Sequence, residues 1–342
     1  MTFISKDRPQ TGDSANSLSN LHAATDTGLI FMFAGQGSQY FQMGRELYDH
    51  NEVFRRHMDR CDRLLSFDLR DVLYNDARKG AEFDTVEWTH PALFCLGYSL
   101  AQVLIDQGYR PAGVLGHSLG EYIAATIAGM LALEDGLGLV VQQAQILKQT
   151  CAEGSMITVM DSPELYRKRP DIFFRATLGG INYDKSFFVS GLADDLQRVL
   201  TALNSASVFS VQLPVRYGFH SSAIDPAESE FRNICRSVRL AKPQIPLYSC
   251  ALGGVVGDHV LDAADEYLWR IPRGEAQFQT MVANSFPNPE RYAFIDLSAT
   301  ATLSGFLKYG FGDRYTHHFA INQFGRNLDS MATLLSRISL QN

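Results

Sequence analysis

The chain has 342 residues, of which 46% are apolar and 20% charged, as is typical of a globular protein with a sizeable core. Its net charge of −7 disfavours a nucleic-acid-binding protein, because such proteins are usually basic. No run of residues approaches the roughly 20 apolar positions that cross a bilayer, and the five cysteines are scattered without a C-x-x-C pair. We therefore expect reduced thiols, no metal site, no membrane contact and a cytoplasmic location.

The first part of the chain predicts a leader and then a buried strand. Residues 1–27 are polar and lack the apolar core of a signal peptide, so we expect a flexible leader. The apolar run 28–33 is short enough for a buried strand. The following loop, Gly35-Gln36-Gly37, can turn backbone amides toward a ligand, but it has neither the lysine of a P-loop nor the glycine spacing of a dinucleotide site.

Helical patterns and a second strand follow. Helical periodicity covers 43–65 and returns in 93–107, and Thr89-His90-Pro91-Ala92 punctuates the chain between them. An apolar strand then ends at 115, before helical patterns in 123–130 and 134–149. The order strand, helix, strand, helix predicts a right-handed α/β fold.

Between that second strand and its helix lies Gly116-His117-Ser118-Leu119-Gly120, which is typical of a nucleophile elbow. The two glycines let the backbone bend sharply enough to present the Ser118 hydroxyl at the end of the strand. The Leu119 amide lies at a helix N-terminus, where a partial positive charge stabilises an oxyanion. The pattern predicts Ser118 as an acyl-transfer nucleophile; the alternative is a glycine-rich turn that merely contains a serine.

Shorter elements follow from 155 onward. Their order is strand, helix, strand, strand, helix, strand, which predicts a ferredoxin-like subdomain at 153–214 inserted in the larger fold. The chain then returns to the large subdomain, with helices expected at 226–239 and 264–270 and strands near 247 and at 292–296. We thus expect a large subdomain made of 28–152 and 215–342.

Histidine is the usual base for a serine nucleophile. His220 is our candidate among nine histidines, because it lies where the chain returns from the small subdomain, and loops on a rigid scaffold often carry functional groups. His117 is expected to line the pocket or to support the serine. Asp225 is either a triad acid or a helix N-cap before Pro226. The histidines expected at the surface are His22, His50, His57, His259, His317 and His318.

Together, the Gly35-Gln36-Gly37-Ser38-Gln39 loop, the elbow and the segment ending in Tyr217-Gly218-Phe219-His220 resemble the malonyl-CoA:acyl-carrier-protein transacylase family, which includes the acyltransferases of polyketide synthases. The resemblance implies an α/β-hydrolase-like core with a ferredoxin-like insert. It also implies that Ser118 is the nucleophile, that His220 is a base oriented by a backbone carbonyl, and that the amides of Gln36 and Leu119 form the oxyanion hole. It implies a monomer. It also implies that no cofactor is needed, because the phosphopantetheine arm of the acyl carrier protein enters as part of the substrate. Acyl-CoA is a possible second substrate.

One position departs from the malonyl-selective members of that family. They carry an arginine on the helix after the elbow that binds the malonyl carboxylate, whereas this chain has Gln143 at that register and no cation on the helix before Lys148. A neutral amide cannot replace a guanidinium fork, and the missing ion pair should cost on the order of 2–5 kcal/mol for carboxylated acyl groups. His90 replaces a family glutamine and is expected, with His117 and Gln143, to contact the substrate.

The family includes an editing branch, from polyketide clusters with free-standing acyltransferases, in which this arginine is replaced. The present chain resembles that branch because Gln143 stands at the same register. The leading hypothesis is therefore a proofreading hydrolase that releases neutral acyl groups from acyl carrier protein through an acyl-Ser118 ester. The alternative is an acyltransferase that moves acetyl, malonyl or another acyl unit from CoA or a carrier onto a carrier protein. A third reading is an inactive partner that docks to a synthase. Candidate basic patches for carrier docking are Arg167-Lys168-Arg169 and the group Arg232, Arg236 and Arg239.

Overall fold

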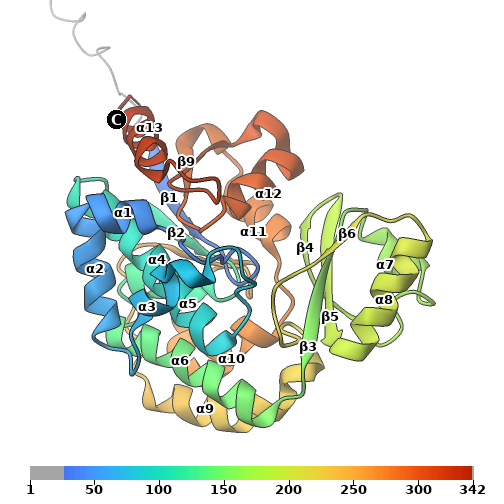
Figure 1. The fold of residues 1–342 in the computed structure, drawn as a ribbon. Helices are drawn as coiled ribbons and strands as arrows, with labels where there is room; N and C mark the ends of the chain where they lie inside the picture. Colours follow the sequence, from blue (N-terminus) through green and yellow to red (C-terminus); the bar gives the residue numbers. More distant parts are fainter. Residues whose placement is uncertain (1–26, 341–342) are drawn as a thin grey trace, which may run out of the picture.

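The computed structural model describes residues 27–340, so almost all of the expected leader, 1–27, and also His22 lie outside the described residues. A six-stranded sheet forms the centre of the larger part of the molecule (Figure 1), in the order β10-β9-β1-β2-β7-β8. Neighbouring strands are parallel except for β8, which pairs antiparallel to β7. The strands are β1 (Gly28–Phe33), β2 (Gly113–Gly116), β7 (Leu247–Ser249), β8 (Gly254–Val255), β9 (Tyr292–Asp296) and β10 (Thr316–Phe319).

Helices cover both faces of this sheet, which explains why β1 is apolar at every position. Phe31 and Phe33 point into one core, whereas Ile30 and Met32 point into a second core on the opposite face. A strand buried on both faces reads as a continuous apolar run rather than as an alternating one. The helices are α1 (Arg45–His50), α2 (Glu52–Asp62), α3 (Leu69–Tyr74), α4 (Val86–Asp106), α5 (Gly120–Ile127), α6 (Leu133–Thr150), α9 (Glu228–Ser237), α10 (Ala264–Arg273), α11 (Phe278–Ser285), α12 (Thr302–Phe311) and α13 (Asn327–Ser339).

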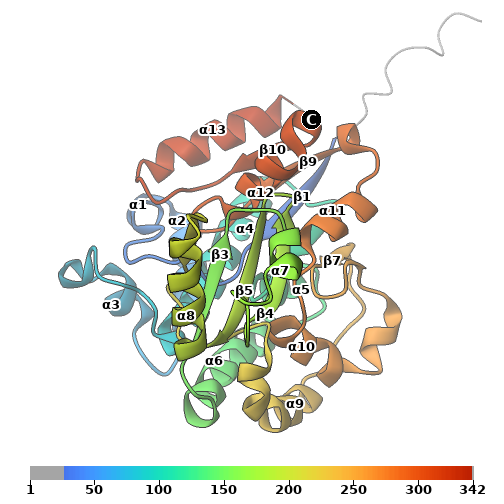
Figure 2. The ribbon, with the colours of Figure 1, turned by 90° about the vertical axis from the view of Figure 1, so that its right-hand side faces the viewer.

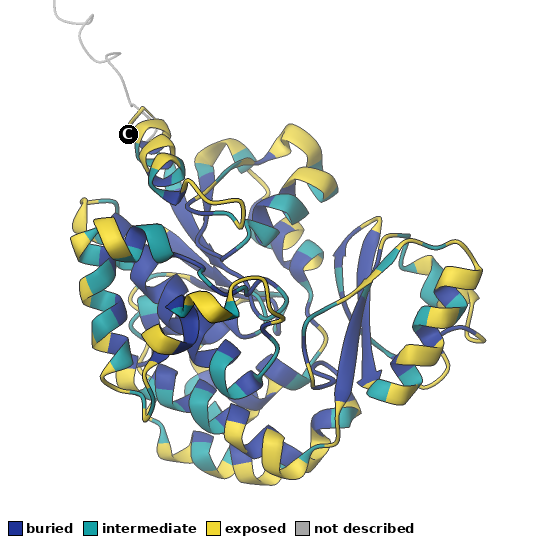
Figure 3. Ribbon diagram, viewed as in Figure 1, coloured by how far each residue is buried: buried dark blue, intermediate teal, exposed yellow. Residues whose placement is uncertain are grey.

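A second, antiparallel sheet lies beside the first and has the order β4-β5-β3-β6. Two helices cover its outer face (Figure 2), while its other face turns toward the larger part of the molecule, and Figure 3 shows its strands as mostly buried. The elements appear in the expected order, all within 153–214: β3 (Gly154–Val159), α7 (Glu164–Lys168), β4 (Thr177–Tyr183), β5 (Ser186–Leu192), α8 (Ala193–Ser205) and β6 (Ser210–Gln212). The expected α/β class is confirmed.

Two helical expectations were wrong in their boundaries. The single helix expected at 43–65 is divided into α1 and α2 at Asn51, whose side chain accepts a hydrogen bond from the Phe54 amide and so begins a new helix. The punctuation expected at 89–92 lies inside α4, which runs through Pro91. His90, Pro91 and Ala92 are all buried, and the burial of this long apolar helix outweighs the one backbone hydrogen bond that proline removes.

The C-terminal part holds elements that the sequence patterns did not indicate. They include α11, α12, α13 and the edge strand β10, which contains His317 and His318. Both of these histidines, and also His57, are half-buried rather than at the surface, whereas His50 and His259 are exposed as expected. The four residues of β10 carry little local signal, and their pairing with β9 is decided by distant residues. Within residues 27–340, none of the helices has the length and apolar character needed to cross a membrane.

Candidate active site

The elbow is a tight turn between β2 and α5 in which Ser118 adopts a positive φ of 54°. A Cβ atom on Gly120 would lie 2.0 Å from the Phe33 carbonyl oxygen, and one on Gly116 would lie 2.3 Å from the Glu121 Cα. Only glycine fits at either place, so the predicted strand-turn-helix geometry is confirmed. The strained backbone holds the serine side chain at the end of the strand, as a nucleophile elbow does.

His220 lies beside this serine, although 102 positions separate them in the chain. Its Nε2 is 2.9 Å from the Ser118 Oγ, and its Nδ1 is 2.6 Å from the Gly274 carbonyl oxygen. A carbonyl oxygen can only accept, so Nδ1 carries the proton and Nε2 is left to accept the serine hydroxyl. Burial lowers the pKa of His220 to about 4, so the ring is neutral at pH 7 and able to act as a base.

Asp225 does not orient this histidine. It forms an ion pair with Arg273 on the surface and lies inside a 3₁₀ helix, Ser222–Ala227, whose N-cap is Ser221. Asp225 is therefore neither the third member of a triad nor an N-cap, and both readings of it were wrong. The carbonyl of Gly274 takes the place that an acid would occupy.

A buried carboxylate joins the elbow to the segment that holds His220. Glu121, in the first turn of α5, accepts hydrogen bonds from the Ser249 hydroxyl at 2.6 Å, the Ala251 amide at 2.7 Å and the Tyr267 hydroxyl at 3.1 Å. Tyr267 belongs to α10. At the end of the same helix, the Pro272 carbonyl oxygen accepts from the His220 backbone amide and the Gly274 carbonyl oxygen accepts from the His220 ring. Burial raises the pKa of Glu121 to about 7. Sequence reasoning missed this residue, whose only signal was an acidic side chain in an apolar helix.

The loop after β1 packs against the elbow at Gly35, and Gln36 and Leu119 line the same small cavity as Ser118. A Cβ atom on Gly35 would lie 2.8 Å from the Ser118 Cβ and 3.0 Å from the Leu119 nitrogen. Among the described residues, neither the Gln36 backbone N–H nor the Leu119 backbone N–H donates to a protein acceptor, whereas the Gln36 side-chain amide donates to the Thr89 hydroxyl at 2.7 Å. Two free donors beside a serine can stabilise the charge that develops on a carbonyl oxygen.

A small cavity of about 10 Å³ lies behind the serine, on the side of α4 and α6. Gln143 is 3% exposed there, and its side-chain amide donates to the Tyr122 hydroxyl at 3.1 Å. His90 places its Nδ1 3.3 Å from the Val140 carbonyl oxygen, and burial lowers its pKa to about 3. The structure thus brings together most of the residues expected at the site; the lining is Gln36, His90, Ser118, Leu119, Tyr122, Gln143, Phe219, Ile271 and Pro272.

A larger cavity of about 140 Å³ lies on the other side of the serine, between the two sheets. His117 lines it and packs edge-on against Phe278 and Phe306, and burial lowers its pKa to about 3. No lysine or arginine of the described residues lines either cavity, and the histidines there are neutral at pH 7. Nor do residues 27–340 contain a cluster of three potential metal ligands. The side chains that line the two cavities around Ser118 are therefore uncharged at pH 7.

Comparisons with known proteins relate the whole fold to one family. The family described as acyl transferase domain matches residues 30–338. The chain is 37% identical over 285 residues to the polyketide biosynthesis acyltransferase homolog PksD of Bacillus subtilis (strain 168), covering 82% of this chain and 86% of the relative. It is 34% identical to the homolog BaeD of Bacillus velezensis over the same shares. Among solved structures, the acyltransferase domain from module 8 of the salinomycin polyketide synthase superposes with a TM-score of 0.82 at 26% identity, covering 93% of this chain and 76% of that one.

Proposed function

Because this chain belongs to the acyl transferase domain family, we propose that it releases neutral acyl groups from an acyl carrier protein by hydrolysis, through an ester on Ser118. The names of its relatives PksD and BaeD support a place in polyketide biosynthesis. The enzyme then works without a cofactor as a cytoplasmic monomer, and the phosphopantetheine arm enters with the carrier.

The observation that carries this proposal is the uncharged lining around Ser118. By the family resemblance, Gln143 stands at the register where malonyl-selective members carry an arginine, and among the described residues no lysine or arginine lines either cavity. Burying the malonyl carboxylate there without a partner would be unfavourable. The cavity beside Gln143 has about the volume that one water molecule requires, which supports a short acyl group such as acetyl.

In the first half of the reaction, His220 Nε2 accepts the proton of the Ser118 hydroxyl while Oγ attacks the thioester carbonyl. The Gln36 and Leu119 amides stabilise the oxyanion of the tetrahedral intermediate. The C–S bond then breaks, and the His220 imidazolium gives its proton to the departing pantetheine sulfur. The acyl group is left as an ester on Ser118.

In the second half, a water molecule takes the place of the departed thiol. His220 Nε2 accepts one of its protons as the water oxygen attacks the ester carbonyl, and the same two amides stabilise the second oxyanion. The ester C–O bond breaks, the proton passes from His220 to the Ser118 oxygen, and the free acid leaves. The serine is regenerated without any redox step.

The alternative is that a carrier thiol, rather than water, attacks the same ester. The family description and the solved acyltransferase domains favour this transfer of acetyl, malonyl or another acyl unit from CoA or a carrier. An inactive docking partner is disfavoured, because the hydrogen bond between Ser118 and His220 is in place.

We also assign 28–152 and 215–342 to an α/β-hydrolase-like core and 153–214 to a ferredoxin-like insert. The observed order of elements in the second sheet, with strand order β4-β5-β3-β6, supports the second assignment.

One time course tests the proposal. Purified protein is given acetyl-, butyryl- and malonyl-loaded carrier protein together with an empty acceptor carrier, and mass spectrometry follows free acid and transferred acyl groups. Free acid from the two neutral substrates, abolished in Ser118→Ala, is expected. Rapid acyl transfer to the acceptor with little free acid would establish the transferase instead, and fast malonyl transfer would contradict the interpretation of Gln143.

A further inference from the structure

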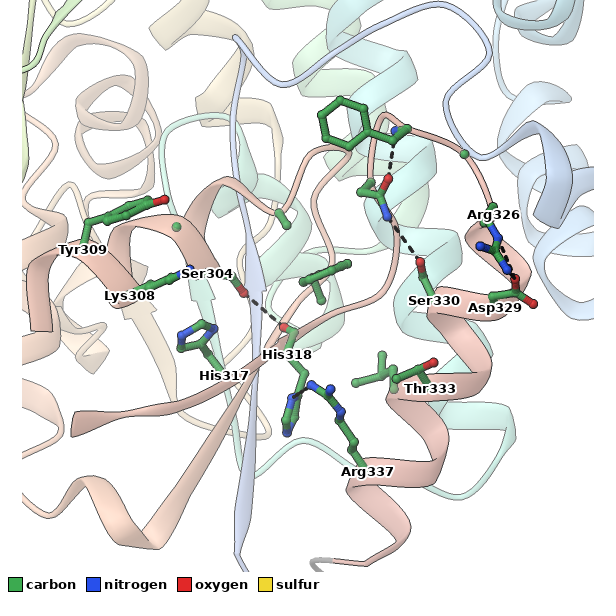
Figure 4. Close-up of a pocket in the computed structure, with 17 residues that line it drawn as sticks. Ser304, Lys308, Tyr309, His317, His318, Arg326, Asp329, Ser330, Thr333 and Arg337 are labelled. Atoms are coloured by element: carbon green, nitrogen blue, oxygen red, sulfur yellow. Dashed lines mark hydrogen bonds and ion pairs between the residues drawn. The ribbon is translucent and has the colours of Figure 1, made fainter. Parts of the chain in front are cut away.

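A groove of about 790 Å³ lies at the open edge of the six-stranded sheet, and helix α12 separates it from the larger of the two cavities around Ser118. In Figure 4, residues of α12 lie on one side of it and residues of α13 on the other, with His317 and His318 of the edge strand β10 between them. We call this surface the α12–α13 groove. Neither its charge nor its position is explained by the chemistry of Ser118.

The groove is cationic in a chain whose net charge is −7. Lys308, Arg326 and Arg337 line it against a single carboxylate, that of Asp329, which pairs with Arg326. Among residues 27–340, neither Lys308 nor Arg337 has an acidic partner within ion-pair distance. Their positive charges are thus available to an acidic ligand.

The basic patches singled out in the sequence differ in this respect. Most of their arginines already form ion pairs with acidic neighbours. The pairs are Arg167 with Glu164, Arg169 with Asp171, Arg232 with Glu228 and Asp265, and Arg236 with Asp265. These patches are solvated, internally paired faces and make weak docking sites.

The α12–α13 groove also adjoins the catalytic pocket through a single helix. Thr302 and Phe306 line the larger catalytic cavity, whereas Ser304 and Lys308, on another face of α12, line the groove. A second connection is the hydrogen bond from the Tyr40 hydroxyl to the Asn322 carbonyl oxygen, 3.0 Å, which ties the loop beyond Gln36 to the loop that borders the groove. A partner seated in the groove would therefore be separated from the larger cavity by the width of one helix.

We propose that the α12–α13 groove docks the acidic face of the acyl carrier protein, an inference that rests on the proposed function. The groove suits a protein better than a small metabolite, because its cations are exposed rather than enclosed. Two exposed aromatic side chains also line it, Tyr309 at 68% and Phe324 at 86% exposure. Aromatic residues and arginine are enriched in protein interfaces, and this groove presents both.

The test uses three thioesters of the same acyl group: one on the carrier protein, one on CoA and one on free pantetheine. Each is given to the native protein and to the double variant Lys308→Glu/Arg337→Glu. The variant should raise KM for the acyl-carrier by about tenfold or more, because it turns two attractions into repulsions. Its kcat/KM for acyl-pantetheine should stay unchanged. Arg239→Glu is the matched control, an exposed cation of the other patch, and should affect none of the three substrates.

Other outcomes separate this inference from the proposed function. An equal loss on the carrier and pantetheine thioesters would show that the substitutions disturb the catalytic pocket, and the docking proposal would fail. An equal rise in KM for acyl-carrier and for acyl-CoA would place the nucleotide phosphates of CoA in the groove and would also overturn it. If the native protein cleaves none of the three thioesters, it is the proposed hydrolysis that fails.

Discussion

Replacing Gln143 by arginine tests the chemistry of the acyl site most directly. In the native protein the Gln143 side chain is 3% exposed and donates to the Tyr122 hydroxyl, and both side chains line the small cavity beside Ser118. Gln143→Arg places a guanidinium at this position without any carboxylate to pair with it. We expect the variant to accept malonyl groups and to lose stability at the same time.

Both effects have a magnitude that can be estimated. A buried, unpaired charge costs about 3–5 kcal/mol, so the free energy of unfolding should fall by about that much in the absence of substrate. A malonyl carboxylate would supply the missing partner, and a close charge pair contributes on the order of 2–5 kcal/mol. The ratio of kcat/KM for malonyl over acetyl substrates should therefore rise by about 30-fold or more.

The assay measures free acid and transferred acyl groups from malonyl- and acetyl-loaded carrier protein, and urea unfolding measures stability. Gln145→Arg is the matched control, because it makes the same substitution on the exposed face of the same helix. It should leave the malonyl-to-acetyl ratio of kcat/KM unchanged, and it should change the free energy of unfolding by no more than about 0.5 kcal/mol. An unchanged malonyl-to-acetyl ratio in a folded Gln143→Arg variant would refute the reasoning.

Four further predictions concern the serine and its surroundings. Asp225→Asn should change kcat less than about threefold, because it breaks only a surface ion pair and leaves the carbonyl that orients His220; a loss of about 100-fold would make this aspartate part of the catalytic unit. The single-turnover acylation rate should fall as the pH drops through about 4, where His220 gains its proton, and a fall near 6.5 would show an unperturbed ring. Burial raises the pKa of Glu121 to about 7, so this carboxyl contributes about 3 kcal/mol of stability at low pH, which is lost as the pH rises from about 4.5 to about 7. Glu121→Gln should remove this pH-dependent contribution. A difference in the free energy of unfolding between native protein and variant that does not change with pH, measured by urea unfolding, would contradict this prediction. Gly35→Ala should lower kcat about 100-fold, because its Cβ would lie 2.8 Å from the Ser118 Cβ, and normal activity would mean that the loop can shift.

Much of the fold was predictable because the relevant signals are local. The strands β1 and β9 were predicted at their observed residues from short apolar runs, and the order of elements in the second sheet followed from alternating short patterns. The errors lie where tertiary contacts override local preference. Proline inside α4 is one example, and the short edge strand β10 is another.

The candidate site divides in the same way. The elbow could be predicted from the sequence because the turn requires glycine, serine and glycine at a fixed spacing within a few neighbouring residues. His220 could be chosen only by its place at a return between subdomains and by family resemblance. The sequence also showed that residue 143 is a neutral glutamine. It did not show that the Gln143 side chain is buried in the cavity beside Ser118.

By itself, then, the sequence determined the elbow, the α/β order of elements and the absence of a cation before Lys148 on the helix that carries Gln143. Only the tertiary structure decided that Gly274 rather than Asp225 orients His220, that Glu121 joins α5 to α10, and that unpaired cations gather between α12 and α13. The physical reason is that turns and strand periodicity depend on neighbours along the chain. A hydrogen-bond partner or an ion pair depends instead on which distant segments the packed core brings within about 3 Å of one another.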